Sequence, residues 1–327
     1  MATPSDDLHF QIDIEHCGQR LDRVLTALLP DCSRSYLAQL IRSGVLVVNQ
    51  QRRKPSYRLG LGDIITGRRP SDPAPVRYAP EAIPLDILHE DAFLIVLDKP
   101  AGLVVHPAPG HPSGTLVNAL LAHCPELAQG EDPHRPGIVH RLDKDTSGVM
   151  VVAKERRVHE SLAHQFKQRL VRKHYLALVR GRMNAKHGEI DLPIGRHPTD
   201  RKKMSIITRH GRPAETHWSL RQQFEGAALL SLELKTGRTH QARVHCAAMQ
   251  HSILGDPVYG GRHRGDTILP TEVRQALTAA GRQMLHAWRL SFRHPVNKQE
   301  MRFEAALPED MRHILALLAT QPSEEVH

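Results

Sequence analysis

Apolar and charged positions alternate with a helical period over the first part of the chain. Between residues 20 and 29, leucines and valine recur at i, i+3, i+4, i+7 and i+8, which is the spacing of one apolar helix face. A second helix is expected with Ser33 as its N-cap and Gly44 at its end, and its apolar face consists of Leu37, Leu40 and Ile41. The pattern therefore predicts two short amphipathic helices.

A β-hairpin is expected directly after the second helix. Residues 45–48 are apolar and indicate a strand, a polar turn follows at 49–53, and Ile64 and Ile65 supply the second strand. Gln50 follows Asn49 where a two-residue turn favours glycine, so we expect a longer turn than usual. The unit of two helices and a hairpin is rich in arginine, namely Arg20, Arg23, Arg34, Arg42, Arg52 and Arg53.

The rest of the chain separates into a linker and a larger domain. Residues 68–80 contain four prolines among small and charged residues, a composition typical of an extended linker. Beyond it, strand-like runs alternate irregularly with helical segments, and the clearest are 93–97, 149–153, 160–168, 175–179, 229–234 and 309–319. We therefore predict an α+β protein whose larger domain, residues 81–327, is mixed and mainly antiparallel.

Composition narrows the classes of partner. The chain has 44 Lys and Arg against 35 Asp and Glu, a formal net charge of +9, which favours a polyanionic partner: RNA, DNA or an acidic membrane surface. No apolar stretch approaches the roughly 20 residues of a membrane span, and residues 1–10 do not have the pattern of a signal peptide. We expect a cytoplasmic protein without a membrane partner.

The sequence gives no sign of a bound cofactor. Its four cysteines lack CxxC spacing and are interpreted as reduced thiols, and its 23 histidines form no HExxH or similar ligand cluster. A phosphate-binding GxxxxGK[ST] loop, a dinucleotide glycine fingerprint and a GxSxG elbow are also missing from the sequence. We expect neither a metal nor a cofactor.

The most informative segment is residues 140–148, His-Arg-Leu-Asp-Lys-Asp-Thr-Ser-Gly, followed by the apolar run 149–153. Asp143 lies among His140, Arg141 and Lys144, which would keep its carboxylate ionised, and the apolar run would anchor the loop on a buried strand. This arrangement suits a carboxylate that attacks. By itself it also fits a salt-bridged loop at the start of a strand.

His-Arg-Leu-Asp followed by Thr-Ser-Gly resembles the active-site motif of the RluA-type pseudouridine synthases, which convert uridine in RNA to its C-glycoside isomer. The resemblance implies that Asp143 is the catalytic carboxylate, acting either as nucleophile at the ribose C1′ or as base at C2′. It implies that Arg141 fills the gap left by the flipped uridine, and that Asp145 is not essential.

Two further segments resemble this family in the same order along the chain. Residues 172–177 match a motif whose tyrosine, here Tyr175, stacks on the target base. Residues 235–245 match a third motif, and Arg243 aligns with the arginine that forms an ion pair with the catalytic aspartate. Ala242 departs from the family, which normally has Leu or Ile there, and we expect looser packing beneath the arginine.

The remaining matches concern architecture and RNA binding. Residues 97–107 and 255–261 match segments that we interpret as mostly architectural. Residues 196–203 resemble a hairpin that grips RNA. The amino-terminal unit, residues 18–67, resembles the alpha-L RNA-binding domain, with residues 68–80 as the linker to the catalytic domain. The expected RNA-binding residues are Arg34, Arg42, Arg141, Arg196, Arg201 and Lys202.

These resemblances imply an enzyme that isomerises uridine to pseudouridine, and we expect it to be a monomer. The combination is most similar to members that modify several uridines of a large-subunit ribosomal RNA stem-loop. Three alternatives stay open at this point: a synthase for another rRNA or a tRNA site, a non-catalytic RNA-binding protein of ribosome assembly, and a base-excising hydrolase. Asp143 argues against the second, and the lack of a second acidic motif argues against the third.

Overall fold

The computed structural model describes residues 7–29, 32, 34–68, 78–108, 110–129, 136–200, 203–208, 210–260 and 269–320. The chain divides into two compact units, residues 1–76 and 77–327. Ser33 and most of the proline-rich segment, residues 69–77, lie outside the described residues.

The amino-terminal unit combines two helices with a three-stranded antiparallel sheet of order β1-β3-β2. The predicted apolar faces form its core, since Leu25, Leu37 and Ile41 are all fully buried. Gly44, at φ 81°, lies just after the second helix. The elements are β1 (Asp7–Gln11), α1 (Leu21–Leu28), α2 (Arg34–Ser43), β2 (Leu46–Val48) and β3 (Ile64–Arg68).

The turn after β2 is tighter than its sequence suggests. Asn49 and Gln50 both adopt left-handed backbone conformations, with φ of 51° and 61°, and Val48 and Gln51 exchange two backbone hydrogen bonds of 3.0 Å. The expectation of a longer turn was therefore wrong, because glutamine takes the conformation that glycine usually supplies. The amide side chain of Asn49 also accepts a hydrogen bond from Ile64 N at 2.8 Å, across the long connection between β2 and β3.

The larger unit contains a nine-stranded sheet of order β4-β5-β6-β13-β7-β12-β11-β8, with β14 paired to β13. All of its neighbouring strands are antiparallel except β6 and β13, which confirms the mainly antiparallel expectation. The strands are β4 (Asp86–Glu90), β5 (Leu94–Lys99), β6 (Ser147–Ala153), β7 (Arg172–Arg180), β8 (His187–Asp191), β11 (Glu215–Phe224), β12 (Ala227–Leu234), β13 (Leu285–Arg293) and β14 (Glu300–Glu304).

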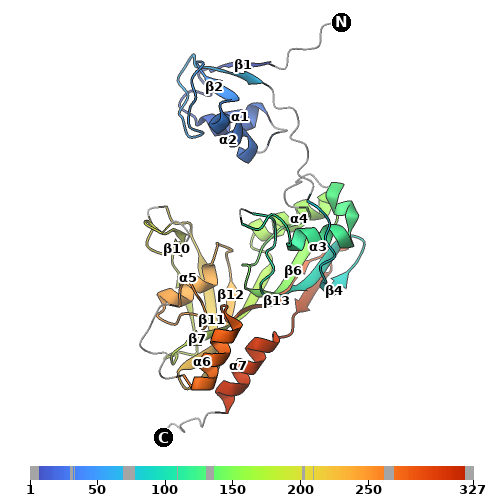
Figure 1. The fold of residues 1–327 in the computed structure, drawn as a ribbon, viewed down its shortest axis with the longest axis vertical. Coiled ribbons are helices and arrows are strands. Elements are labelled where there is room, and N and C mark those ends of the chain that lie inside the picture. Colours follow the sequence, from blue (N-terminus) through green and yellow to red (C-terminus); the bar gives the residue numbers. More distant parts are fainter. Residues whose placement is uncertain are drawn as a thin grey trace. The chain divides into compact units, whose positions relative to one another are not determined.

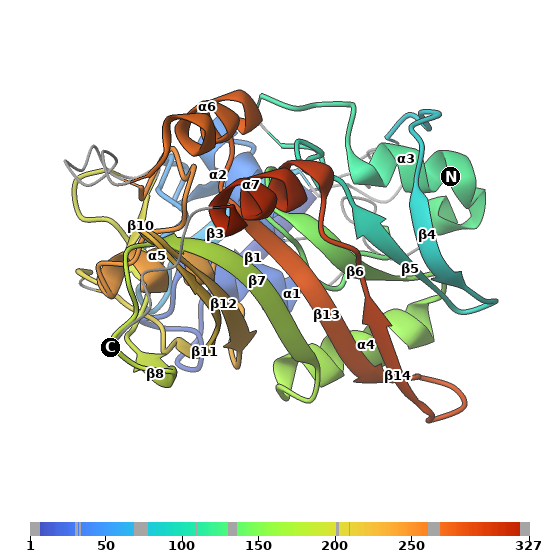
Figure 2. The same cartoon turned by 90° about the horizontal axis from the view of Figure 1, so that it is seen from below.

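Helices pack around this sheet (Figures 1 and 2). In both views α6 and α7 lie side by side, and their apolar residues share a core with β7. A separate two-stranded pair consists of β9 (Gly195–Arg196) and β10 (Met204–Ser205). The helices are α3 (Leu116–His123), a 3-10 turn (Pro125–Gln129), α4 (Arg156–Lys167), α5 (Gln241–Ala248), α6 (Thr271–Ala280) and α7 (Glu309–Ala319).

Strand β6 is buried along its whole length, which explains the continuous apolar run after the Asp143 motif. Met150 and Val152 belong to the core beneath α3, whereas Val149 and Val151 belong to the core beneath α4. Successive side chains of a strand point to opposite faces, so a strand covered on both faces must be apolar throughout. The loop that carries Asp143 is therefore attached to the best-packed strand of the sheet.

Gly148 allows β6 to approach β13 closely. Its φ is +119°, and a Cβ atom there would lie 2.2 Å from the carbonyl oxygen of Ala287. A side chain at this position would separate the two parallel strands.

In the described part of the chain, no helix is long and apolar enough to cross a membrane. The same residues contain no group of three or more His, Cys, Asp or Glu side chains placed to hold a metal ion.

Candidate active site

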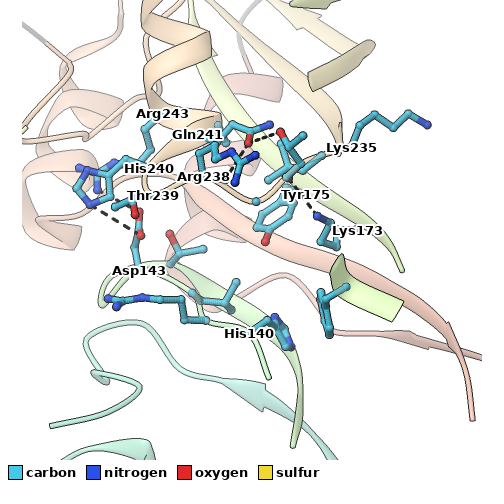
Figure 3. A pocket seen from close by; sticks show the side chains of 18 of the residues that line it. His140, Asp143, Lys173, Tyr175, Lys235, Arg238, Thr239, His240, Gln241 and Arg243 are labelled. Carbon is cyan, nitrogen blue, oxygen red and sulfur yellow. Dashed lines mark hydrogen bonds and ion pairs between the residues drawn. The ribbon is translucent and has the colours of Figure 1, made fainter. Parts of the chain in front are cut away.

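Asp143, Tyr175 and Arg243 line one cleft of about 540 Å³ in the larger unit. Asp143 comes from the loop before β6, Tyr175 from β7, and Arg243 from α5. Figure 3 shows the three side chains around the same space, with Arg243 and His240 on the side of Asp143. The sheet order makes this possible because only β13 separates β6 from β7.

The expected ion pair between Asp143 and Arg243 is present. Nη1 of Arg243 lies 3.2 Å from Oδ2 of Asp143, with 6% of the arginine side chain and 21% of the aspartate side chain exposed. The aspartate therefore faces the cleft while its cationic partner is covered. The carboxylate is thus paired with a cation and still accessible to a ligand.

Asp256 fixes the arginine from its other side. The guanidinium donates from Nε to Oδ2 at 2.7 Å and from Nη2 to Oδ1 at 2.9 Å. The same carboxylate accepts the backbone N–H groups of Val258 and Tyr259. Burial alone would lower the pKa of Arg243, but the hydrogen bonds and charges of Asp256 and Asp143 raise it above its usual value. The arginine is thus permanently charged and held in a fixed orientation.

Sequence reasoning treated residues 255–261 as architectural and so missed the contact of Asp256 with the site. The sequence signal for this contact was the carboxylate of Asp256, 13 residues after Arg243. Ala242, which we expected to loosen the packing under the arginine, is buried. The two hydrogen bonds that Arg243 donates to Asp256 do not involve the side chain at position 242.

Tyr175 contributes a partly buried ring and a hydroxyl group. The ring packs between two of the apolar cores, one beneath α3 and one against α5 to α7. Burial, and then the negative charge of Asp143, raise the pKa of Tyr175 above its usual value. The phenol consequently stays protonated at neutral pH, so it can stack on a base and donate a hydrogen bond.

His240 also borders the site, although sequence reasoning did not select it. Its Nε2 lies 3.9 Å from Oδ1 of Asp143, and its Nδ1 lies 2.9 Å from the hydroxyl of Tyr259. Burial lowers the pKa of His240, an effect that Asp143 opposes and Arg243 reinforces. The imidazole is therefore mainly neutral at pH 7, and Arg243 is the cation that pairs with Asp143.

The expectation that His140 helps to keep Asp143 ionised was wrong. The His140 ring accepts a hydrogen bond from Val151 N at 3.1 Å and stacks on Phe166 with 4.6 Å between ring centroids. Burial lowers the pKa of His140 to about 3. The residue is a neutral anchor for the loop, and contributes no charge.

Lys99 holds the other end of the loop. Its ammonium group is fully buried and donates to three carbonyl oxygens, those of Pro100 at 2.7 Å, Leu103 at 2.9 Å and Lys144 at 3.0 Å. Burial lowers the pKa of Lys99 to about 8. Since Lys144 directly follows Asp143, these bonds fix the backbone of the carboxylate.

The predicted RNA-binding residues occupy different places. Arg141 is exposed and lines the cleft beside Asp143, and Arg196 is exposed on β9. Arg42 is exposed in the last turn of α2, and Arg34 forms a 2.9 Å ion pair with Asp22 while 57% of its side chain stays exposed. The remaining two, Arg201 and Lys202, lie outside the described residues.

Comparison with known families gives two matches. Residues 93–248 match the RNA pseudouridylate synthase family, and residues 19–65 match the S4 domain. The first match includes Asp143, Tyr175 and Arg243, and the second includes α1, α2 and β2.

Several curated relatives match along most of the chain. The ribosomal large subunit pseudouridine synthase D of Neisseria meningitidis is 45% identical over 311 residues, which cover 94% of this chain and 80% of the relative. The enzyme of the same name from Nitrosomonas europaea is 44% identical, covering 94% of this chain and 87% of its own. The solved structure of human RNA pseudouridylate synthase domain containing 4 is 28% identical, with a TM-score of 0.57 over 73% of this chain and 95% of that chain.

Proposed function

The chain belongs to the RNA pseudouridylate synthase family, and on this premise we propose that it isomerises uridines of large-subunit ribosomal RNA, with Asp143 as the catalytic carboxylate. The observation that carries the proposal is the exposed face of Asp143 in a cleft whose buried wall holds Arg243 at 3.2 Å. The amino-terminal unit is an S4 domain, as the helix–helix–hairpin pattern indicated.

The reaction breaks the bond between N1 of uracil and C1′ of ribose and forms a bond between C5 and C1′. The proton on C5 is lost and N1 gains one, so neither an oxidant nor an energy source is required. What the protein must supply is a positioned carboxylate, a surface for the freed base and an environment that keeps the carboxylate charged. Asp143, Tyr175 and Arg243 match these three needs in turn.

We assign the following roles within the cleft. Asp143 acts on the ribose, either by attack at C1′ or as a base at C2′. Arg243 keeps the carboxylate ionised and oriented, and Asp256 positions Arg243. Tyr175 stacks on the uracil, because an aromatic ring on a rigid strand offers a flat surface to every orientation of the base. Arg141 takes the space that the uridine leaves in the RNA, since a guanidinium can both stack and bind phosphate.

The relatives support a large-subunit rRNA target, and the chemistry favours a loop within it. The relatives from Neisseria and Nitrosomonas carry that target in their names, and they align with this chain over both of its units. A uridine must leave its base stack before it reaches Asp143, and this costs least in a single-stranded loop. We therefore propose a stem-loop with more than one modified uridine as the substrate.

RNA outside the target nucleotide would be held by basic side chains in both units. Arg34 and Arg42 of the S4 domain, Arg141 beside the cleft, and the segment with Arg196, Arg201 and Lys202 are the proposed contacts. Their charges would neutralise phosphates and release counterions, so binding would weaken as salt increases.

Mapping of pseudouridines tests the target. Total RNA from the source organism, with and without this gene, is treated with a carbodiimide that marks pseudouridine, and the marks are read by primer extension. We expect several neighbouring marks to disappear from one loop of large-subunit rRNA. A loss confined to tRNA or to small-subunit rRNA would contradict the target while leaving the reaction intact.

A further inference from the structure

The basic side chains that line the cleft outnumber its carboxylates. Among the described residues, seven lysine and arginine side chains line it, and Asp143 is the sole carboxylate. Arg243 is occupied by Asp143 and Asp256, and Lys235 pairs with Glu233 at 2.6 Å. The remaining basic side chains are Arg141, Lys167, Arg169, Lys173 and Arg238.

Three of these side chains, Arg169, Lys173 and Arg238, line the cleft together with Tyr175, and we name them the basic trio. They come from three elements: Arg169 follows α4, Lys173 lies on β7 and Arg238 lies in the loop before α5. Figure 3 shows Tyr175 between Asp143 and Lys173, so the lysine is on the opposite side of the ring from the carboxylate. Nζ of Lys173 donates to the carbonyl oxygen of Thr236 at 3.0 Å.

The members of the trio act on one another electrostatically. Burial lowers the pKa of Lys173 to about 8, and the charges of Arg169 and Arg238 add to this effect. Glu233 opposes it, but that carboxylate pairs with Lys235. His140, on the loop below, is neutral. Nε of Arg238 donates to the carbonyl oxygen of Pro213 at 3.1 Å, so backbone carbonyl oxygens hold two members of the trio. An anion at this wall of the cleft would be attracted by all three charges.

The backbone conformation of Arg169 allows a glycine at this position. Its φ is +60°, the left-handed conformation that follows the last turn of α4, and Leu170 N closes the turn on the Gln165 carbonyl oxygen at 2.9 Å. Glycine adopts this conformation without strain, whereas other residues do not. Glycine therefore fits this turn, and replacing Arg169 by glycine should leave α4 and the turn after it intact.

We propose that the basic trio binds a backbone phosphate next to the target uridine, so that the RNA is held on one side of Tyr175 while Asp143 acts on the ribose on the other side. The proposal rests on the proposed function, because it takes the ligand to be RNA. Phosphate suits the trio, since two guanidinium groups and an ammonium group from different directions can contact its oxygens. The phosphate on the 5′ side and that on the 3′ side are both candidates.

Arg169→Gly is the variant of choice, because it removes one member of the trio and relieves the backbone strain. Lys298→Gly is the matched control: Lys298 is an exposed basic residue with φ +63° in the turn between β13 and β14, away from the cleft residues. Neither variant should lower the melting temperature. We expect Arg169→Gly to bind a synthetic hairpin RNA with a uridine loop about tenfold more weakly, with a shallower salt dependence, and Lys298→Gly to bind it as the wild type does.

Neutralising single phosphates gives the decisive test. Each loop phosphate of the hairpin is replaced in turn by a methylphosphonate, and the affinity of the full-length protein is measured. The wild type and Lys298→Gly should lose affinity at one position, whose place relative to the target uridine distinguishes the 5′ from the 3′ phosphate. Arg169→Gly should no longer respond at that position.

An unchanged response of Arg169→Gly at every loop phosphate, or a wild type insensitive to all of them, would overturn the proposal. The proposed function fails by a different result, namely no pseudouridine formed by the wild type on any RNA. The two failures are separable because the phosphate scan measures binding, not turnover.

Discussion

Replacing Asp256 by asparagine should loosen the orientation of Arg243, which stays positively charged. Oδ1 of Asp256 accepts from Val258 N at 2.9 Å, Tyr259 N at 3.0 Å and Nη2 of Arg243 at 2.9 Å, and an amide oxygen can keep all three bonds. Oδ2 accepts from Nε at 2.7 Å, and there the amide would present a second donor to the guanidinium. One charge-assisted bond and one buried charge are therefore lost.

The expected magnitudes follow from this contact. Removing one partner of a buried ion pair costs roughly 3 kcal/mol or more, so the free energy of unfolding should fall by about 3 kcal/mol. Arg243 would then be held at position 256 by one hydrogen bond instead of two and could shift relative to Asp143. A displacement of about 1 Å in a catalytic group lowers the rate by roughly a hundredfold. We expect kcat to fall by about that factor and KM to change little, because Asp256 itself is buried away from the RNA.

Tritium release from RNA labelled at C5 of uridine measures turnover, and urea unfolding followed by fluorescence measures stability. Glu304→Gln is the control, since Glu304 pairs with Arg289 at 2.6 Å while 46% of the glutamate side chain and 28% of the arginine side chain stay exposed. We expect this substitution to change the free energy of unfolding by at most about 1 kcal/mol and to leave turnover normal. If Asp256→Asn keeps kcat within a few fold of the wild type, Asp256 does not position Arg243, and the reasoning is wrong.

Three further outcomes are expected. Tyr175→Phe should keep RNA affinity and the melting temperature, because the ring is retained, yet lower kcat at least tenfold; an unchanged kcat would show that the hydroxyl has no part in the reaction. Asp98 faces Asp86 across β4 and β5, and burial followed by this like charge raises the pKa of Asp98 to about 6. Because the folded state holds this proton more tightly than the unfolded state, stability is lost as pH rises from about 4 to 6. Asp98→Asn should therefore raise the free energy of unfolding by about 1 kcal/mol at pH 7 and leave it unchanged below pH 4. Urea titrations at both pH values measure this difference. Deletion of residues 1–79 should weaken binding and flatten its salt dependence, and an unchanged salt slope by filter binding would exclude the S4 domain from RNA contact.

Local structure could be predicted from the sequence because the periodicity of apolar residues and the positions of capping and turn residues are local signals. The two amino-terminal helices and the strands after Asp143 and around Tyr175 are present, since buried faces repeat at fixed intervals. The order of the sheet could not be predicted. Ser147 of β6 pairs in parallel with His286 of β13, a contact between residues 139 positions apart that no local pattern encodes.

The candidate site shows the same division. The order of the three motifs along the chain identified Asp143, Tyr175 and Arg243 as candidate site residues. The fold places them around one cleft. The partnership of Arg243 with Asp256 depends on how α5 packs against the turn at 256–259, so the sequence did not reveal it. The neutrality of His140 was missed for a similar reason, because burial, which depends on the tertiary fold, decides its charge.

The central claim is that Asp143 carries out the chemistry, and turnover by Asp143→Asn tests it most directly. Asparagine preserves the size and the hydrogen bond to Arg243 but cannot attack or accept a proton. With RNA labelled at C5 of uridine, the account predicts no tritium release above background, at an RNA affinity within about twofold of the wild type. Turnover within about tenfold of the wild type, a loss of only about 1.4 kcal/mol in the barrier, would contradict it.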